Sequence, residues 1–63
     1  MTPPAALNER DTATYLGLSR PYLRRCRRLG TGPAFIRLGR TIRYAVADLD
    51  AWLNAHRVDR GRR

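Results

Sequence analysis

The segment SRPYLRRCRRLG, residues 19–30, contains five arginines and the only cysteine of the chain. Guanidinium groups bind phosphates and guanine edges, whereas a thiol can ligate a metal or take part in redox chemistry. A zinc site needs about four protein ligands, and the chain offers only Cys26 and His56. No hydroxyl residue has a plausible base nearby. We therefore expect no metal, no cofactor and no enzymatic activity, and the chemistry of the segment is that of its arginines.

The distribution of charge supports binding to a polyanion. The 63 residues include thirteen basic residues, all arginine, and five acids, giving a net charge of +8. Residues 12–47 contain eight of the arginines and none of the acids, so the whole excess charge falls in that block. The alternative is a solvated surface, but such surfaces normally mix both signs.

Two short helices are expected to position these arginines. The first begins after Asn8, a good N-cap with Asp11 three residues later, and ends at Gly17. For the second, Ser19 or Arg20 is the cap. Because the residue before a proline avoids helical conformation, we expect the second helix to begin at Pro21 and to end at Gly30.

On a helical wheel of this second helix, most arginines lie opposite a narrow apolar arc that contains Leu23 and Cys26. Tyr22 and Leu29 share that arc. Arginine pairs three and four residues apart repel one another, which costs the free protein roughly 1 to 2 kcal/mol. An anion bound along the arginine face would offset this cost. Cys26 is therefore expected to be a core residue and the arginines to form the working surface.

Residues 31–45 predict a β-hairpin, because β-favouring residues flank Gly39. A two-residue loop would mix polar and apolar side chains on both faces. A three-residue loop over residues 39–41 pairs Leu38 with Ile42 and Ile36 with Tyr44, which gives one apolar face. We expect this second register, which puts Arg37 and Arg43 together on the opposite face with Arg40 at the tip.

A third helix is expected within residues 46–57, where Leu49, Trp52, Leu53 and His56 recur at helical spacing. Residues 7–56 then form a single small domain, flanked by flexible segments at 1–6 and 57–63. The fold class is mostly α with a two-stranded hairpin, in the order α-α-β-β-α. The predicted core residues are Leu16, Leu23, Cys26, Ile36, Leu38, Ile42, Leu49, Trp52 and Leu53.

The spacing of several of these residues, and the sequence that follows them, resemble a known family. The spacing typical of a helix-turn-helix motif is found at Ala13, Gly17, Leu23 and Cys26. The following sequence, GTGPAFIRLGRTIRYAVADLDAWL, resembles the wing and closing helix of small MerR-like winged-helix proteins, which include phage excisionases. The resemblance extends from about Leu7 to Leu53. It implies a winged helix-turn-helix whose second helix enters the major groove of DNA and whose wing contacts the backbone or the minor groove.

On this basis the residues at the start of the second helix, Arg20 and Arg24, are the candidates for guanine contacts in the major groove. Arg40, at the narrow glycine turn, is the candidate for the minor groove. The candidates for phosphate contacts are Ser19, Arg25, Arg27, Arg28, Arg37 and Arg43.

The resemblance implies an excisionase, a recombination directionality factor that binds and bends attachment-site DNA cooperatively so that a phage integrase excises. The alternative is a small MerR-like regulator that binds one promoter operator. A third class, a basic segment that binds membranes or RNA, is disfavoured because the fold should bury its apolar arc. We expect double-stranded DNA and an integrase as partners, self-association on DNA, no membrane and no small-molecule ligand. The absence of a signal peptide or membrane span suggests a cytoplasmic protein in a bacterial host.

Overall fold

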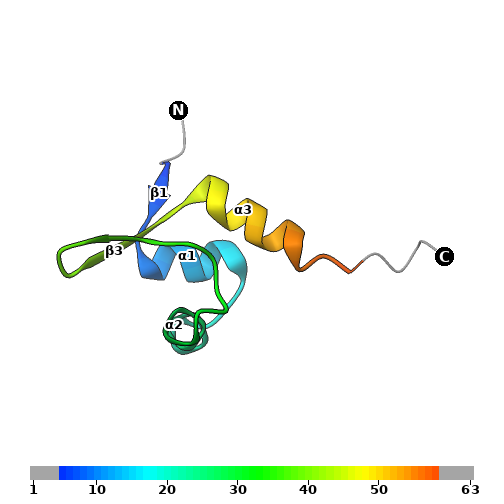
Figure 1. The fold of residues 1–63 in the computed structure, drawn as a ribbon, viewed down its shortest axis with the longest axis horizontal. Helices are drawn as coiled ribbons and strands as arrows, with labels where there is room; N and C mark the ends of the chain where they lie inside the picture. Colours follow the sequence, from blue (N-terminus) through cyan, green and yellow to red (C-terminus); the bar gives the residue numbers. More distant parts are fainter. Residues whose placement is uncertain (1–4, 59–63) are drawn as a thin grey trace.

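The computed structural model describes residues 5–58. Its helices are α1 (Glu9–Leu16), α2 (Arg20–Leu29) and α3 (Val46–Ala55), and its strands are β1 (Ala6–Leu7), β2 (Ile36–Leu38) and β3 (Thr41–Ala45). The hairpin of β2 and β3, called the wing below, projects on one side, and α3 leads away on the other (Figure 1). This is the predicted winged helix-turn-helix. Of the expected flexible segments at 1–6 and 57–63, residues 1–4 and 59–63 lie outside the described part of the chain.

Local capping fixes both ends of α1, as predicted. The Asn8 side chain accepts a hydrogen bond from the backbone N–H of Asp11 at 2.7 Å. Gly17 ends the helix in the left-handed conformation, with φ of 72°, which a glycine adopts without steric cost. From the last turn of α1, the hydroxyl of Tyr15 donates to Asp50 in α3 at 2.5 Å.

The start of α2 differs by one residue from the prediction. Ser19 is the N-cap, because its hydroxyl accepts from the backbone N–H of Tyr22 at 3.3 Å. The helix begins at Arg20, and Pro21 occupies its second position. Proline is tolerated there because the N–H it lacks has no partner in the first turn of a helix. The serine cap therefore outweighs the reluctance of Arg20 to become helical before a proline.

The predicted register of the wing is wrong. Leu38 pairs with Thr41 and Ile36 with Arg43, so the loop contains only two residues, Gly39 and Arg40. Gly39 has φ of 65°, which fits a two-residue turn with glycine in its first central position, the type whose twist matches the strands. An apolar face specifies register only where that face is buried, and the whole of β2 is exposed.

The arginines of the wing are consequently separated. Residues directly opposite each other in an antiparallel pair share a face, and neighbours along a strand alternate. Arg43 lies on the face of its partner Ile36, whereas Arg37 lies on the other face with its partner Ile42. The expectation that Arg37 and Arg43 project together is therefore wrong.

A third strand extends the sheet beyond the expected hairpin. Ala6 pairs with Ala45 and Leu7 with Tyr44, which gives the strand order β1-β3-β2. The backbone N–H of Val46 also donates to the carbonyl of Ala5 at 2.9 Å. Residues 5 and 6, assigned to a flexible segment from the sequence, thus belong to the folded domain. A strand of two residues is too short to show an alternating pattern.

The core lies between the helices and β3, the second strand of the wing. Its buried cluster is Ala13, Leu23, Tyr44 and Leu49, with Leu7, Leu16 and Ile42 packed against it. Cys26 is also buried, as predicted. Ile36, Leu38 and Leu53 are exposed instead of buried, with exposed fractions of 42 %, 61 % and 40 %. The first two lie on the projecting edge strand, and Leu53 lies in the last turn of α3, where the helix has left the sheet (Figure 1).

Trp52 is half-buried and forms a hydrogen bond between α3 and the loop after α2. Its indole N–H donates to the carbonyl of Thr31 at 3.2 Å. The ring of His56 packs against Trp52, with centroids 4.5 Å apart. The largest apolar residue of the chain therefore links α3 to this loop and is not a member of the buried core cluster.

Replacing Thr12 with valine should stabilise the domain. Thr12 is fully buried, and its hydroxyl has no hydrogen-bond partner among residues 5–58. Removing an unpaired buried hydroxyl while retaining the branched shape should add about 1 kcal/mol to the free energy of unfolding. Thermal melting followed by circular dichroism should show a midpoint roughly 4 to 8 °C higher. Thr14→Val, at an exposed position of the same helix, is the control and should give no such rise. An unchanged or lower midpoint for Thr12→Val would contradict the assignment.

Candidate nucleic-acid interface

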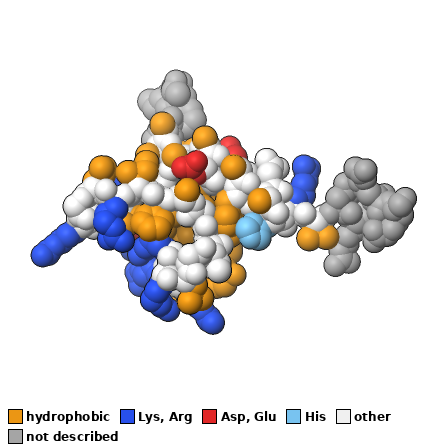
Figure 2. Space-filling view, viewed as in Figure 1, with side chains coloured by type: hydrophobic (Ala, Val, Ile, Leu, Met, Phe, Trp, Pro, Cys, Tyr) orange, Lys and Arg blue, Asp and Glu red, His pale blue; other side chains and the backbone are white. Residues whose placement is uncertain are grey.

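An open groove of about 520 Å³ lies between the start of α1, one face of α2 and the wing. Arginines from all three elements line it: Arg10, Arg20, Arg27, Arg40 and Arg43. Most of the arginine side chains visible in Figure 2 gather over α2 and the wing, while the visible acids lie toward β1 and the start of α3. Four arginines of the basic block, Arg20, Arg27, Arg40 and Arg43, therefore line one groove of the folded protein.

Glu9, the first residue of α1, lies inside this groove and binds three arginines of α2. Its carboxylate accepts hydrogen bonds from Arg20 at 3.0 and 3.2 Å, from Arg24 at 3.1 Å to each oxygen, and from Arg27 at 3.4 Å. The three arginines stand one helical turn apart and so share one face of α2. Residues 12–47 contain no acid, but the fold brings Glu9 against their arginines. Glu9 therefore offsets much of the repulsion expected between these arginines.

Glu9 stays ionised at neutral pH. Partial burial acts to raise the pKa of its carboxyl, but the hydrogen bonds from Arg20, Arg24 and Arg27 and the charge of Arg24 outweigh burial and hold the pKa below its ordinary value. The carboxylate is thus a permanent part of the surface at the pH of the cell.

Arg27 points inward and connects the two halves of the surface. Its Nη1 donates to the hydroxyl of Tyr44 at 3.0 Å, which raises the pKa of Arg27 further. The guanidinium also lies over the ring of Phe35, 5.9 Å from its centre. Its side chain is 21 % exposed. The position of Arg27 suits a link between α2 and the wing better than the predicted phosphate contact.

The remaining predicted residues lie around the groove or beside it. No hydrogen bond or ion pair joins the side chains of Arg25, Arg28 and Arg40 to any residue between 5 and 58, and all three are exposed. Arg37 lies over Phe35, 5.8 Å from the ring centre, and Arg43 donates to the carbonyl of Ile42. The Ser19 hydroxyl is engaged as the cap of α2.

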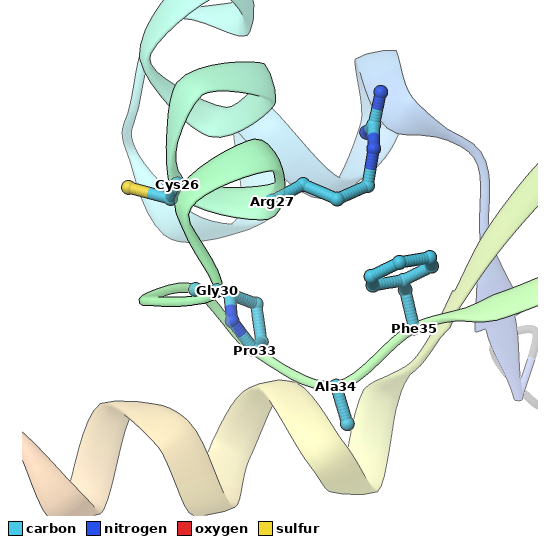
Figure 3. Close-up of a pocket in the computed structure, with 7 residues that line it drawn as sticks. Cys26, Arg27, Gly30, Pro33, Ala34 and Phe35 are labelled. Atoms are coloured by element: carbon cyan, nitrogen blue, oxygen red, sulfur yellow. The ribbon is translucent and has the colours of Figure 1, made fainter.

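Cys26 does not belong to this surface. Figure 3 shows Cys26 and Arg27 leaving α2 in opposite directions, with Phe35 on the side of Arg27. Both residues border a second hollow of about 340 Å³ beneath the end of α2, together with Gly32 and Pro33. A side chain at position 32 would bring its Cβ within 3.0 Å of the Cys26 Cβ, so the cysteine packs closely against the following loop.

Sequence reasoning missed two residues of the site, Glu9 and Tyr44. Tyr44 had been placed only on the wing, but it lies at the centre of the core and orients Arg27. Glu9 has no role in the sequence-based prediction, because an acid at the start of a helix is accounted for by capping. The signal that could have found it is its position at the start of the first helix of a helix-turn-helix, which crosses the second helix closely.

Comparison with known families agrees with this geometry. A family model described as a helix-turn-helix domain matches residues 7–57. No curated protein matches the chain. Within residues 5–58, the longest helices have ten residues, and none is long and apolar enough to span a membrane.

Proposed function

The chain belongs to the helix-turn-helix domain family, whose fold implies sequence-specific DNA binding, and we propose that it is an excisionase that binds and bends attachment-site DNA. In this proposal the protein catalyses no reaction itself. It directs a phage integrase toward excision, and neighbouring copies bind the DNA cooperatively.

The observation that carries the proposal is the single groove shared by α2 and the wing. Arg20 at the start of α2 and Arg40 at the wing tip line the same groove, so one duplex can contact both elements. A helix in the major groove and an arginine in the adjacent narrow minor groove would hold a deformed duplex. The sequence resemblance to phage excisionases in the wing and closing helix favours this role over that of a promoter regulator.

The arginines fall into groups according to the part of the DNA that each could contact. Arg20 and Arg24 are half-exposed near the start of α2, the part of a recognition helix that contacts base edges. We assign them to guanines in the major groove, where a planar guanidinium can donate to O6 and N7. Arg25, Arg28, Arg37 and Arg43 would neutralise phosphates, and Arg40 would enter the minor groove.

Footprinting on the DNA that flanks the gene for this protein tests the proposal. We expect several adjacent sites in the same orientation, DNA bending in a circular-permutation assay, and excision by the integrase only when the protein is present. Arg40→Ala should reduce bending, whereas Arg57→Ala removes the same charge from a residue outside the groove and should not. A single palindromic site at a promoter, without an effect on excision, would instead identify a transcriptional regulator.

A further inference from the structure

The carboxylate of Glu9 is covered by the arginines that would contact DNA. The Glu9 side chain is 17 % exposed, whereas the side chains of Arg20 and Arg24 are 48 % and 50 % exposed. The two guanidinium groups therefore bind Glu9 and still reach the surface. An acid in this position could be a charge that DNA must displace or a support that remains in place.

The guanidinium nitrogens that bind Glu9 indicate that it supports the two arginines and stays in place. Arg24 uses only its Nε to bind both oxygens of Glu9, and within residues 5–58 its two terminal nitrogens make no hydrogen bond. Arg20 uses Nε and Nη2 and leaves Nη1 unengaged in the same part of the chain. Each arginine thus keeps donors that point away from the carboxylate, and the outer end of Arg24 retains the two-donor fork that guanine or phosphate accepts.

Displacement of Glu9 would be unfavourable. If Arg20 and Arg24 swung fully onto DNA, the carboxylate would lose most of its hydrogen bonds and face nearby phosphates while partly hidden from water. If the contacts stay, the arginines are ordered before DNA arrives, so less side-chain entropy is lost on binding. Retention of the Glu9 contacts is therefore the lower-energy arrangement.

We propose that Glu9 is a positioning residue that determines specificity by holding Arg20 and Arg24 toward base edges in the DNA complex. The inference rests on the proposed DNA binding of α2. Removing the charge of Glu9 should strengthen binding to any DNA through electrostatics, whichever role Glu9 has. Only if Glu9 positions the arginines should its removal also weaken discrimination between sequences.

Glu9→Gln, compared with Asp11→Asn, tests this inference. Asp11 lies in the same first turn and is exposed, and in the described part of the chain its only ion pair is with Arg10. Both changes raise the net charge by one. A duplex selected by the wild-type protein from a random library and a scrambled duplex of the same composition serve as probes, with dissociation constants measured at about 0.15 M salt, where screening is physiological.

We expect Asp11→Asn to tighten binding to both duplexes by similar factors, so that the ratio of the two constants is unchanged. Glu9→Gln should bind the scrambled duplex as well as Asp11→Asn does. Its preference for the selected duplex, measured as the ratio of the two dissociation constants, should fall about tenfold, which is the order of effect expected when long side chains lose their ordering. An unchanged ratio for Glu9→Gln, or equal tightening on both duplexes, would overturn the inference. A wild-type protein that prefers no duplex would instead contradict the proposed function and the inference with it.

Two further measurements separate positioning from folding. In an Arg24→Ala background, Glu9→Gln should change the ratio clearly less than in the wild type, because part of its effect passes through Arg24; an equal effect would overturn the inference. In the wild-type complex with the selected duplex, the Nε proton of Arg24 should exchange with solvent as slowly as in the free protein. Rapid exchange in the complex would show that Glu9 has been released.

Discussion

Replacing Tyr44 with alanine should unfold most of the protein at room temperature. Tyr44 is fully buried, with an exposed fraction of 0 %, and it is the largest of the fully buried side chains in the described part of the chain. Its ring packs near Phe35, and its hydroxyl accepts from Arg27. Removing a buried aromatic ring costs about 3 to 5 kcal/mol, which is comparable to the whole stability of a domain of this size. Circular dichroism and urea denaturation would measure the loss.

Tyr44→Phe is the matched control, because it keeps the ring and removes only the hydroxyl that binds Arg27. We expect this variant to fold and to lose about 1 kcal/mol of unfolding free energy, the usual contribution of one hydrogen bond. If Tyr44→Ala melted at the same urea concentration as the wild type, Tyr44 would not be the centre of the core.

The ends of the first two helices could be predicted from the sequence because their determinants are local. Asn8 caps α1 through a backbone N–H three residues away, and Gly17 and Gly30 both adopt the left-handed conformation that ends a helix. Such contacts depend on neighbours along the chain and hardly on the fold. The one-residue difference at Arg20 arose where two local preferences competed.

The wing and the core were less predictable because they depend on distant contacts. The register was argued from an apolar face, but Ile36 and Leu38 lie on an edge strand that no helix covers. The geometry of the Gly39 turn decided the pairing instead. Tyr44 of β3 joins Leu23 of α2 in the core, a contact between residues far apart in the sequence.

The candidate site was predictable in its residue types and only partly in its arrangement. The wheel placed most of the arginines of α2 on one face, and the structure adds that Arg20, Arg24 and Arg27 all bind Glu9. A count of acids along the sequence cannot reveal this, since Glu9 belongs to another helix. The inward position of Arg27 likewise depends on Tyr44, which lies seventeen residues further along the chain.

Arg24→Ala should abolish most of the preference for a specific site while leaving the fold intact. Arg24 is half-exposed, and its outer end makes no hydrogen bond within residues 5–58. Glu9 would still be paired with Arg20 and Arg27, so the groove should keep its shape. Loss of a bidentate guanine contact costs about 1 to 3 kcal/mol, which corresponds to a factor of about 5 to 150 in the dissociation constant.

Arg28→Ala is the matched control on the same helix, since Arg28 is exposed and has no partner between residues 5 and 58. As a phosphate contact it should weaken binding to every duplex by a similar factor and reduce the slope of log K against log salt by about 1. The two variants remove the same charge from α2, but only Arg24 also binds Glu9, so contact with bases is judged from the preference for one duplex over another and not from affinity alone.

One measurement decides whether α2 recognises DNA bases through its first turns: the dissociation constants of Arg24→Ala and Arg28→Ala on a selected and on a scrambled duplex. We predict that Arg24→Ala lowers the preference for the selected duplex by at least about fivefold and that Arg28→Ala leaves this preference unchanged. Equal losses on both duplexes for Arg24→Ala, or an affinity equal to that of the wild type, would contradict the placement of this helix in the major groove.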